Sequence, residues 1–126
     1  LIIEQTESLT AIDVNTGKCT RLPGDQSQED TMRRVNLEAS REVARQLRLR
    51  NLSGIIIVDF INLATLDQEE ELLRELRRLT AEDPVTVQVV DMTPLGLVEI
   101  TRRKIYPSLR EQIKNAKQHI PGQRPE

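Results

Sequence analysis

The sequence predicts a single α/β domain in which crossover helices connect the strands of a mixed β-sheet. Its 126 residues are enough for one hydrophobic core, and a content of 37% hydrophobic and 30% charged residues is typical of a globular domain. Apolar residues alternate or run continuously in some segments and recur every three to four residues in others. These segments follow the order strand–helix–strand twice, which favours α/β layering with right-handed crossovers.

Two short strands are expected at the start of the chain, over residues 1–5 and 9–14. The three residues between them fit a tight hairpin, although the turn lacks an Asn-Gly pair. Residues 15–18 then form a loop in this prediction, and Pro23-Gly24-Asp25 has the composition of a turn.

A long helix is predicted from about residue 28 to residue 50. Its apolar stripe recurs at intervals of three and four residues and consists of Met32, Val35, Ala39, Val43 and Leu47. Ser27 and Asp30 have the spacing of an N-cap pair, which places the start of the helix.

A central strand and a second helix follow. Residues 54–60 are a continuous, largely β-branched run, which is typical of a strand buried on both faces. Thr65 and Gln68 have capping-box spacing and begin a helix that ends at Asp83-Pro84. The buried side of this helix is expected to consist of Leu72, Leu73, Leu76 and Leu79.

Two more strands are predicted in the last part of the chain, over residues 85–92 and 95–100. Pro107 opens a third helix over residues 108–118, and residues 121–125, rich in Pro and Gly, form a frayed tail. We therefore expect one folded unit over residues 1–108 and a C-terminal helix end and tail over residues 109–126.

The composition excludes several kinds of site. Phe60 and Tyr106 are the only aromatic residues, which argues against a sugar-stacking cleft or a base-stacking platform. Cys19 is the only cysteine, so the chain cannot form an internal disulfide. With His119 as the only histidine, the two residues together cannot supply the usual three or four ligands of a zinc site. The sequence contains no run of about 18 apolar residues, so it predicts no membrane-spanning helix. If the chain is an enzyme, we expect its active site to use carboxylates and a hard cation.

Three predicted strands carry an aspartate at their end: Asp13, Asp59 and Asp91. Ligands of α/β sheets gather beyond the carboxyl ends of parallel strands, and carboxylates that converge there repel one another unless a cation lies between them. Each aspartate could instead cap a loop or a helix. We favour the capping interpretation for Asp91, and the residues alone leave both interpretations open for Asp13 and Asp59.

A charged stripe on the long helix lies opposite its apolar stripe. It consists of Arg34, Glu38, Arg41, Arg45 and Arg48. The net charge is only −2, but 14 of the 18 basic residues are arginine, the residue favoured for phosphate recognition and interface pairs. Geometry favours a solvated face with internal ion pairs, and the alternative is that the four arginines contact RNA or another domain.

Five blocks of the sequence resemble the ribonuclease E/G family, in order and with the family's spacing. They are residues 9–15 (LTAIDVN), 36–39 (NLEA), 44–52 (ARQLRLRNL), 54–61 (GIIIVDFI) and 95–102 (LGLVEITR). Five ordered blocks over roughly residues 1–108 are far more specific than a single short motif.

The resemblance implies the deoxyribonuclease I-like catalytic subdomain of a bacterial, cytoplasmic endoribonuclease that cleaves single-stranded RNA in RNA processing and decay. It implies that Asp13 and Asp59 bind Mg²⁺, for which Mn²⁺ is expected to substitute, and that Asn15 orients the water shell of the ion. The ion would polarise the phosphate and generate the attacking hydroxide from its bound water. Two carboxylates are sufficient because Mg²⁺ keeps several waters.

Three departures from the family pattern affect these expectations. The family's Asp-Phe-Ile-Asp ends in Asn62 here, so one acidic group is lost although both metal-binding positions remain. The family's Cys-Pro-x-Cys zinc link is absent, so we expect no zinc site in this chain, and assembly into a homo-oligomer stays open. The family's RNA-binding and 5′-end-sensing domains lie upstream of the matched blocks, so this chain alone is expected to be a weak or inactive nuclease.

The alternative comes from a different class of protein. It is a non-catalytic α/β module that binds RNA or a protein, in which Asp13 and Asp59 are structural caps and Asn62 marks a decayed metal site. Two carboxylates that lie together on an open surface would favour the nuclease, and carboxylates that point apart or are sealed by hydrogen bonds would favour the module.

Overall fold

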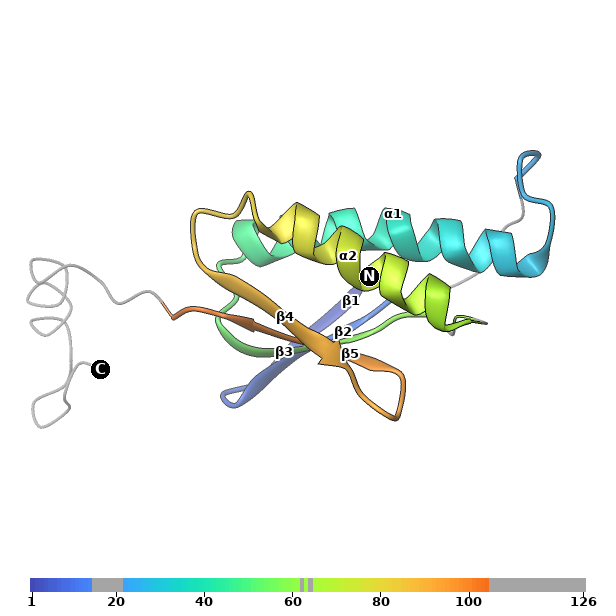
Figure 1. The fold of residues 1–126 in the computed structure, drawn as a ribbon. Helices are drawn as coiled ribbons and strands as arrows, with labels where there is room; N and C mark the ends of the chain where they lie inside the picture. Colours follow the sequence, from blue (N-terminus) through green and yellow to red (C-terminus); the bar gives the residue numbers. More distant parts are fainter. Residues whose placement is uncertain (15–21, 62, 64, 105–126) are drawn as a thin grey trace, which may run out of the picture.

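A computed structural model of the chain describes residues 1–14, 22–61, 63 and 65–104. Within these residues, two helices lie on one face of a five-stranded mixed sheet, as Figure 1 shows. The elements in chain order are β1 (Ile2–Gln5), β2 (Leu9–Asp13), α1 (Gln28–Leu49), β3 (Gly54–Asp59), α2 (Leu66–Thr80), β4 (Val87–Met92) and β5 (Leu97–Arg102). The predicted α/β class is confirmed, and all five strands and both helices form close to their predicted ends. The expected helix over residues 108–118 and the tail lie outside the described residues.

The sheet has the strand order β1-β2-β3-β5-β4. Strands β2 and β3 are parallel, whereas the other neighbouring pairs are antiparallel. The chain therefore crosses over from β2 to β3 through α1 and from β3 to β4 through α2, moving across the sheet in the same direction both times. Crossovers of the same hand in the same direction put both helices on one face, and the other face of the sheet carries no described helix (Figure 1).

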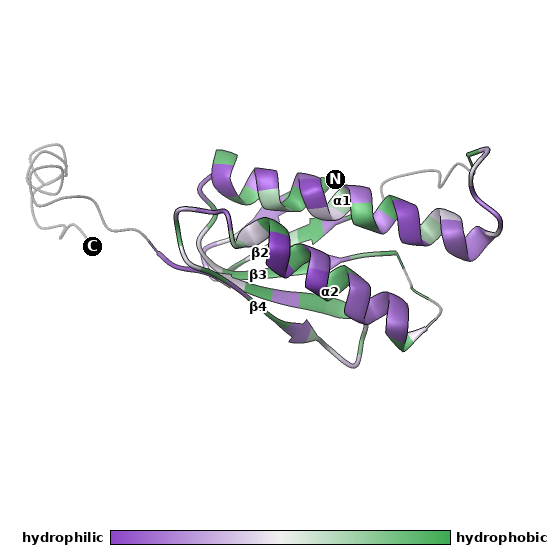
Figure 2. Ribbon diagram, turned by 45° about the horizontal axis from the view of Figure 1, so that its top comes forward, coloured by the Kyte–Doolittle hydropathy of each residue, from purple (hydrophilic) through white to green (hydrophobic). Residues whose placement is uncertain are grey.

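The hydrophobic core lies between the sheet and the two helices. Ile12, Val58 and Ile100 reach it from the sheet, and Leu47 and Leu76 reach it from α1 and α2, all at most 1% exposed. Figure 2 shows largely hydrophobic strands beneath helices on which hydrophilic and hydrophobic stretches alternate. Neither described helix is long and apolar enough to cross a membrane.

The prediction that β3 is buried on both faces is wrong. Ile56 and Val58 are fully buried, but Ile55 is 44% exposed and Asp59 is exposed as well. The reason is topological, because both crossover helices cover the same face and the β-branched run presents its other side chains to the uncovered face. A run of this composition indicates a central strand but does not show how many of its faces are covered.

The buried side of α1 also differs from its predicted apolar stripe. Val43 and Leu47 are buried as expected, but Met32, Val35 and Ala39 are only half-buried. Three polar residues of this helix are buried instead: Thr31, Asn36 and Ser40. The side chain of each of them has a hydrogen-bond partner, so their burial leaves no polar group without a hydrogen bond.

Both predicted helix starts are confirmed. The hydroxyl of Ser27 accepts a hydrogen bond from the Asp30 N–H at 3.1 Å, which caps α1. The hydroxyl of Thr65 accepts one from the Gln68 N–H at 3.2 Å, which caps α2. Each cap satisfies a backbone donor that has no partner inside its helix.

A buried ion pair ties the end of β5 to two loops. The Arg102 guanidinium donates to both carboxylate oxygens of Asp83, at 3.0 and 3.1 Å, and also to the Asn51 side chain and the Leu52 carbonyl. Both charged side chains are at most 3% exposed. Burial alone would raise the pKa of Asp83, but the hydrogen bonds and charge of Arg102 hold that pKa below its ordinary value.

We expect Asp83→Ala to lower the free energy of unfolding by about 3–5 kcal/mol, because it leaves the buried Arg102 charge without its partner. Urea denaturation of the purified chain measures this. Glu71→Ala is the matched control, since it removes an exposed ion pair with Arg33, and such pairs contribute at most about 1 kcal/mol. Equal losses for the two variants would contradict the prediction.

Candidate metal centre

Asp13 and Asp59 lie directly opposite each other at the carboxyl ends of the parallel strands β2 and β3. The backbone N–H of Val14 donates to the Asp59 carbonyl at 3.0 Å and continues the pairing by one residue, which fixes the register at this point. Residues paired in register project to the same face of a sheet. Since Ile12 and Val58 point into the core, both carboxylates project to the uncovered face.

The two carboxylates line a hollow of about 330 Å³ on the uncovered face. Its other lining residues are mostly apolar and are Ile2, Glu4, Ala11, Ile12, Ile57 and Leu97. Neighbouring strands lie about 4.8 Å apart, so a hard cation above Asp13 and Asp59 is within reach of both, directly or through water. No group of three or more Asp, Glu, His or Cys side chains that could hold a metal occurs in the described part of the chain.

The side chain of Asn36 holds the chain where it leaves β3. Its amide nitrogen donates to the Ile61 carbonyl at 2.7 Å, and its amide oxygen accepts the Ile61 N–H at 3.0 Å. Asn36 is 1% exposed and comes from α1, so it satisfies both backbone groups of Ile61 beyond the last residue of the strand. Asn36 therefore connects the crossover helix to the segment two residues after Asp59.

Residues 1–105 of the chain match the Ribonuclease E/G family. The chain belongs to this family. It is 42% identical over 115 residues to Ribonuclease G of Salmonella typhimurium and 40% identical over 111 residues to Ribonuclease E of Escherichia coli. The matches cover 91% and 88% of this chain, but only 23% and 10% of those relatives. A chloroplastic ribonuclease E/G-like protein of Arabidopsis thaliana is 42% identical over 90% of this chain and 11% of its own length.

For a member of the ribonuclease E/G family, this structure brings two of the three expected metal-site residues together. Asp13 and Asp59 share one edge and one face of the sheet. The third, Asn15, lies outside the described residues, and so does Asn62. The resemblance identified Asn36 only as part of a matching block. Its role could not be predicted because a polar residue between Val35 and Ala39 is normally expected at the surface.

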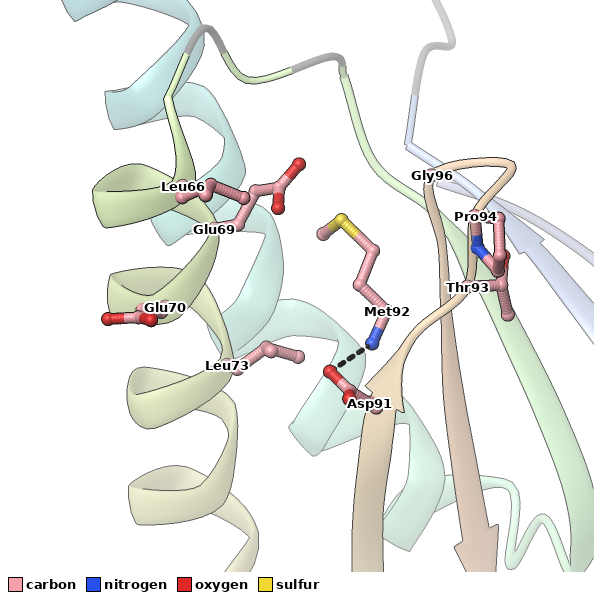
Figure 3. Close-up of a pocket in the computed structure, with 9 residues that line it drawn as sticks. All are labelled: Leu66, Glu69, Glu70, Leu73, Asp91, Met92, Thr93, Pro94 and Gly96. Carbon is pink, nitrogen blue, oxygen red and sulfur yellow. Dashed lines mark hydrogen bonds between the residues drawn. The ribbon is translucent and has the colours of Figure 1, made fainter.

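Asp91 is not part of this pair. It lies within β4, where its carboxylate accepts a hydrogen bond from the Met92 N–H at 2.7 Å, and β5 separates β4 from β3. It lines a larger hollow of about 460 Å³ between α2 and the β4–β5 hairpin, together with Glu69 and Glu70. Figure 3 shows Glu70 pointing away from Asp91, so these three carboxylates do not converge on one position.

The four arginines for which contact with RNA or another domain is the alternative to a solvated face lie on α1, on the helix-covered side of the sheet. Arg41, Arg45 and Arg48 are exposed, and Arg45 pairs with Glu42 at 3.1 Å. Arg34 is less exposed and binds Asp25, and its hydrogen bonds hold the pKa of Asp25 at about 2, below the ordinary 3.8. The arginine stripe and the Asp13–Asp59 pair therefore lie on opposite sides of the sheet.

We expect Asn36→Ala to lower the free energy of unfolding by about 1–3 kcal/mol, because both backbone groups of Ile61 lose their partner. Ser40→Ala is the matched control, since Ser40 is equally buried on α1 but its hydroxyl bonds only to the Leu37 carbonyl of the same helix. Urea denaturation gives the stability, and amide hydrogen exchange at Ile61 gives the local effect. Faster exchange at Ile61 is expected for Asn36→Ala alone, and unchanged exchange there would contradict the role assigned to Asn36.

Proposed function

We propose that this chain is the metal-dependent catalytic part of an endoribonuclease that cleaves single-stranded RNA. The observation that carries the proposal is the Asp13–Asp59 pair, which combines parallel strand ends, one shared face and an open surface. The names of the relatives support it, since they are ribonucleases E and G. Activity on RNA processing intermediates in a bacterial cytoplasm is part of the same proposal.

The donor set fits Mg²⁺ better than a transition metal. Carboxylate oxygens are the ligands that Mg²⁺ prefers, and the ion needs only one or two of them because it keeps several waters. Asp13 and Asp59 would hold the ion, and we expect Mn²⁺ to substitute for it. When bound, Mg²⁺ supplies Lewis-acid polarisation of a phosphate and lowers the pKa of its bound water.

The positions of the two carboxylates determine what they contribute to cleavage. They stand on an uncovered surface, so a phosphodiester can approach from solvent without any described element moving. The parallel register holds them side by side, so both carboxylates would hold the same ion on the face of the sheet that no described helix covers. The only imidazole of the chain, His119, lies outside the described residues, and the proposed chemistry does not need it.

The alternative, a non-catalytic module with a decayed metal site, predicts carboxylates that point apart or are sealed by hydrogen bonds. Asp13 and Asp59 instead project to the same face, and Asp59 is exposed. The arrangement therefore favours the nuclease. The loss of an acidic group at Asn62 leaves the pair itself intact.

We expect Asp13→Asn and Asp59→Asn each to lower the rate of Mg²⁺-dependent RNA cleavage by at least about a hundredfold in the full-length protein, because a metal ion contributes several kcal/mol at the transition state. Cleavage of an end-labelled single-stranded RNA measures the rate, and circular dichroism shows that the fold is retained. Asp91→Asn is the control, since it removes a carboxylate of the same sheet that lies outside the pair. Near-normal cleavage by either test variant would contradict the assignment of that residue.

The exposed arginines of α1 generate a separate prediction. Arg41→Ala and Arg45→Ala should change the free energy of unfolding by less than about 0.5 kcal/mol, as is usual for surface positions. If each contacts one RNA phosphate, each variant should lower the slope of log affinity against log salt by roughly 0.7. Fluorescence anisotropy at several salt concentrations in the full-length protein measures the slope, with Arg74→Ala on α2 as the control. Unchanged slopes would leave only the solvated-face interpretation.

A further inference from the structure

Strand β3 ends at Asp59, so the position of this carboxylate depends on what holds the residues that follow it. Within the sheet, Asp59 pairs with Asp13 of β2 and with Leu97 of β5, and its carbonyl accepts the Val14 N–H at 3.0 Å. The end of a strand opens easily unless the backbone beyond it is also held. A carboxylate at such an end keeps a defined position only if the next residues are fixed as well.

The side chain of Asn36 fixes the backbone beyond the end of β3. It donates to the Ile61 carbonyl at 2.7 Å and accepts the Ile61 N–H at 3.0 Å. Two residues of an antiparallel pair exchange the same two bonds, and a carboxamide offers the same donor and acceptor as a peptide group. Asn36 therefore acts on Ile61 as a neighbouring strand would, although it belongs to a helix.

The carboxamide of Asn36 is itself held in one orientation. Asn36 is 1% exposed, and α1 is anchored in the core by Val43 and Leu47, which are fully buried. A half-turn of the carboxamide would place its donor against the Ile61 N–H and its acceptor against the Ile61 carbonyl, so both bonds would be lost. Asp59 thus lies between two fixed points of the backbone, the bond from Val14 and the pair of bonds from Asn36.

We propose that Asn36 is a positioning residue for the candidate metal centre. By fixing Ile61 it holds Asp59 opposite Asp13, so that one cation can bind to both carboxylates. It acts through the backbone of residues 59–61 and does not contact the ion. This inference rests on the proposed function, because it concerns the same two carboxylates. Ligands that are held in place before binding lower the cost of binding, which is why groups behind the ligands of a metal affect its affinity.

The affinity for a metal ion separates this role from a purely structural one. A purely structural residue changes the free energy of unfolding but not the affinity of the folded protein for the ion. The Asp83–Arg102 pair provides the contrast, since Arg102 pairs with Gly54 at the opposite end of β3. Loss of that pair should destabilise the fold without moving Asp59.

A titration of the 126-residue chain with Mn²⁺, followed by electron paramagnetic resonance of the free ion, measures the affinity. We expect the unaltered chain to bind Mn²⁺ and Asp59→Asn to abolish this binding. Asn36→Ala should weaken it about tenfold, the lower end of the effect of groups behind metal ligands. Ser40→Ala and Asp83→Ala should bind Mn²⁺ as the unaltered chain does. Circular dichroism under the same conditions shows that each variant is folded.

A second variant keeps the test decisive if Asn36→Ala does not fold. Asn36→Leu has nearly the same shape, so it removes both hydrogen bonds to Ile61 without leaving a cavity in the core. We expect it to weaken Mn²⁺ binding as much as Asn36→Ala does, because both variants release the same backbone segment.

The possible failures are distinguishable. Unchanged Mn²⁺ affinity in the Asn36 variants, together with binding that is lost in Asp59→Asn, would overturn this inference and leave the metal centre in place. An equal loss of affinity in Asp83→Ala would assign the effect to general destabilisation and would also overturn it. If the unaltered chain bound no Mn²⁺, or if Asp59→Asn bound it equally well, the metal centre would fail and this inference with it.

Discussion

The parallel, in-register pairing of β2 with β3 is the constraint on which the candidate site depends. Antiparallel strands bring the end of one strand beside the start of the other, so only a parallel pair can place two strand-end aspartates side by side. Parallel neighbours require a crossover, which α1 provides. The same helix then binds the exit of β3 through Asn36, so the element that makes the pairing possible also holds the chain just beyond Asp59.

The two crossovers divide the molecule into two chemically different sides. Both helices lie on one side, together with the buried core and the exposed arginines of α1. The other side holds the carboxylate pair and the mostly apolar residues that line the same hollow. The net charge of −2 is a sum over both sides of the sheet and does not show that arginines lie on one side and the carboxylate pair on the other. The net charge alone therefore could not indicate a partner.

Local patterns predicted the elements well because capping and periodicity are local properties, as at Ser27 and Thr65. They could not predict that β5 inserts between β3 and β4, since a strand pattern does not specify its neighbour. The burial of Asn36 was missed for a related reason, because its partner Ile61 is 25 residues away along the chain. Asp13 and Asp59 became a pair in the prediction only through the family resemblance, and the register now supplies the geometric reason for it.

The position of the carboxylate pair at the end of two strands, on the face that no described helix covers, limits the cost of placing two like charges side by side. Two unit charges about 4 Å apart repel by about 1 kcal/mol in water, against about 4 kcal/mol at the lower effective dielectric typical of pairs near a protein surface. Asp59 is exposed and Asp13 is half-buried, so the repulsion between two ionised carboxylates here lies between these values, which the roughly 5–15 kcal/mol that stabilises a domain can offset. A cation that arrives from solution would remove this repulsion, which is a physical reason for two adjacent carboxylates to bind one.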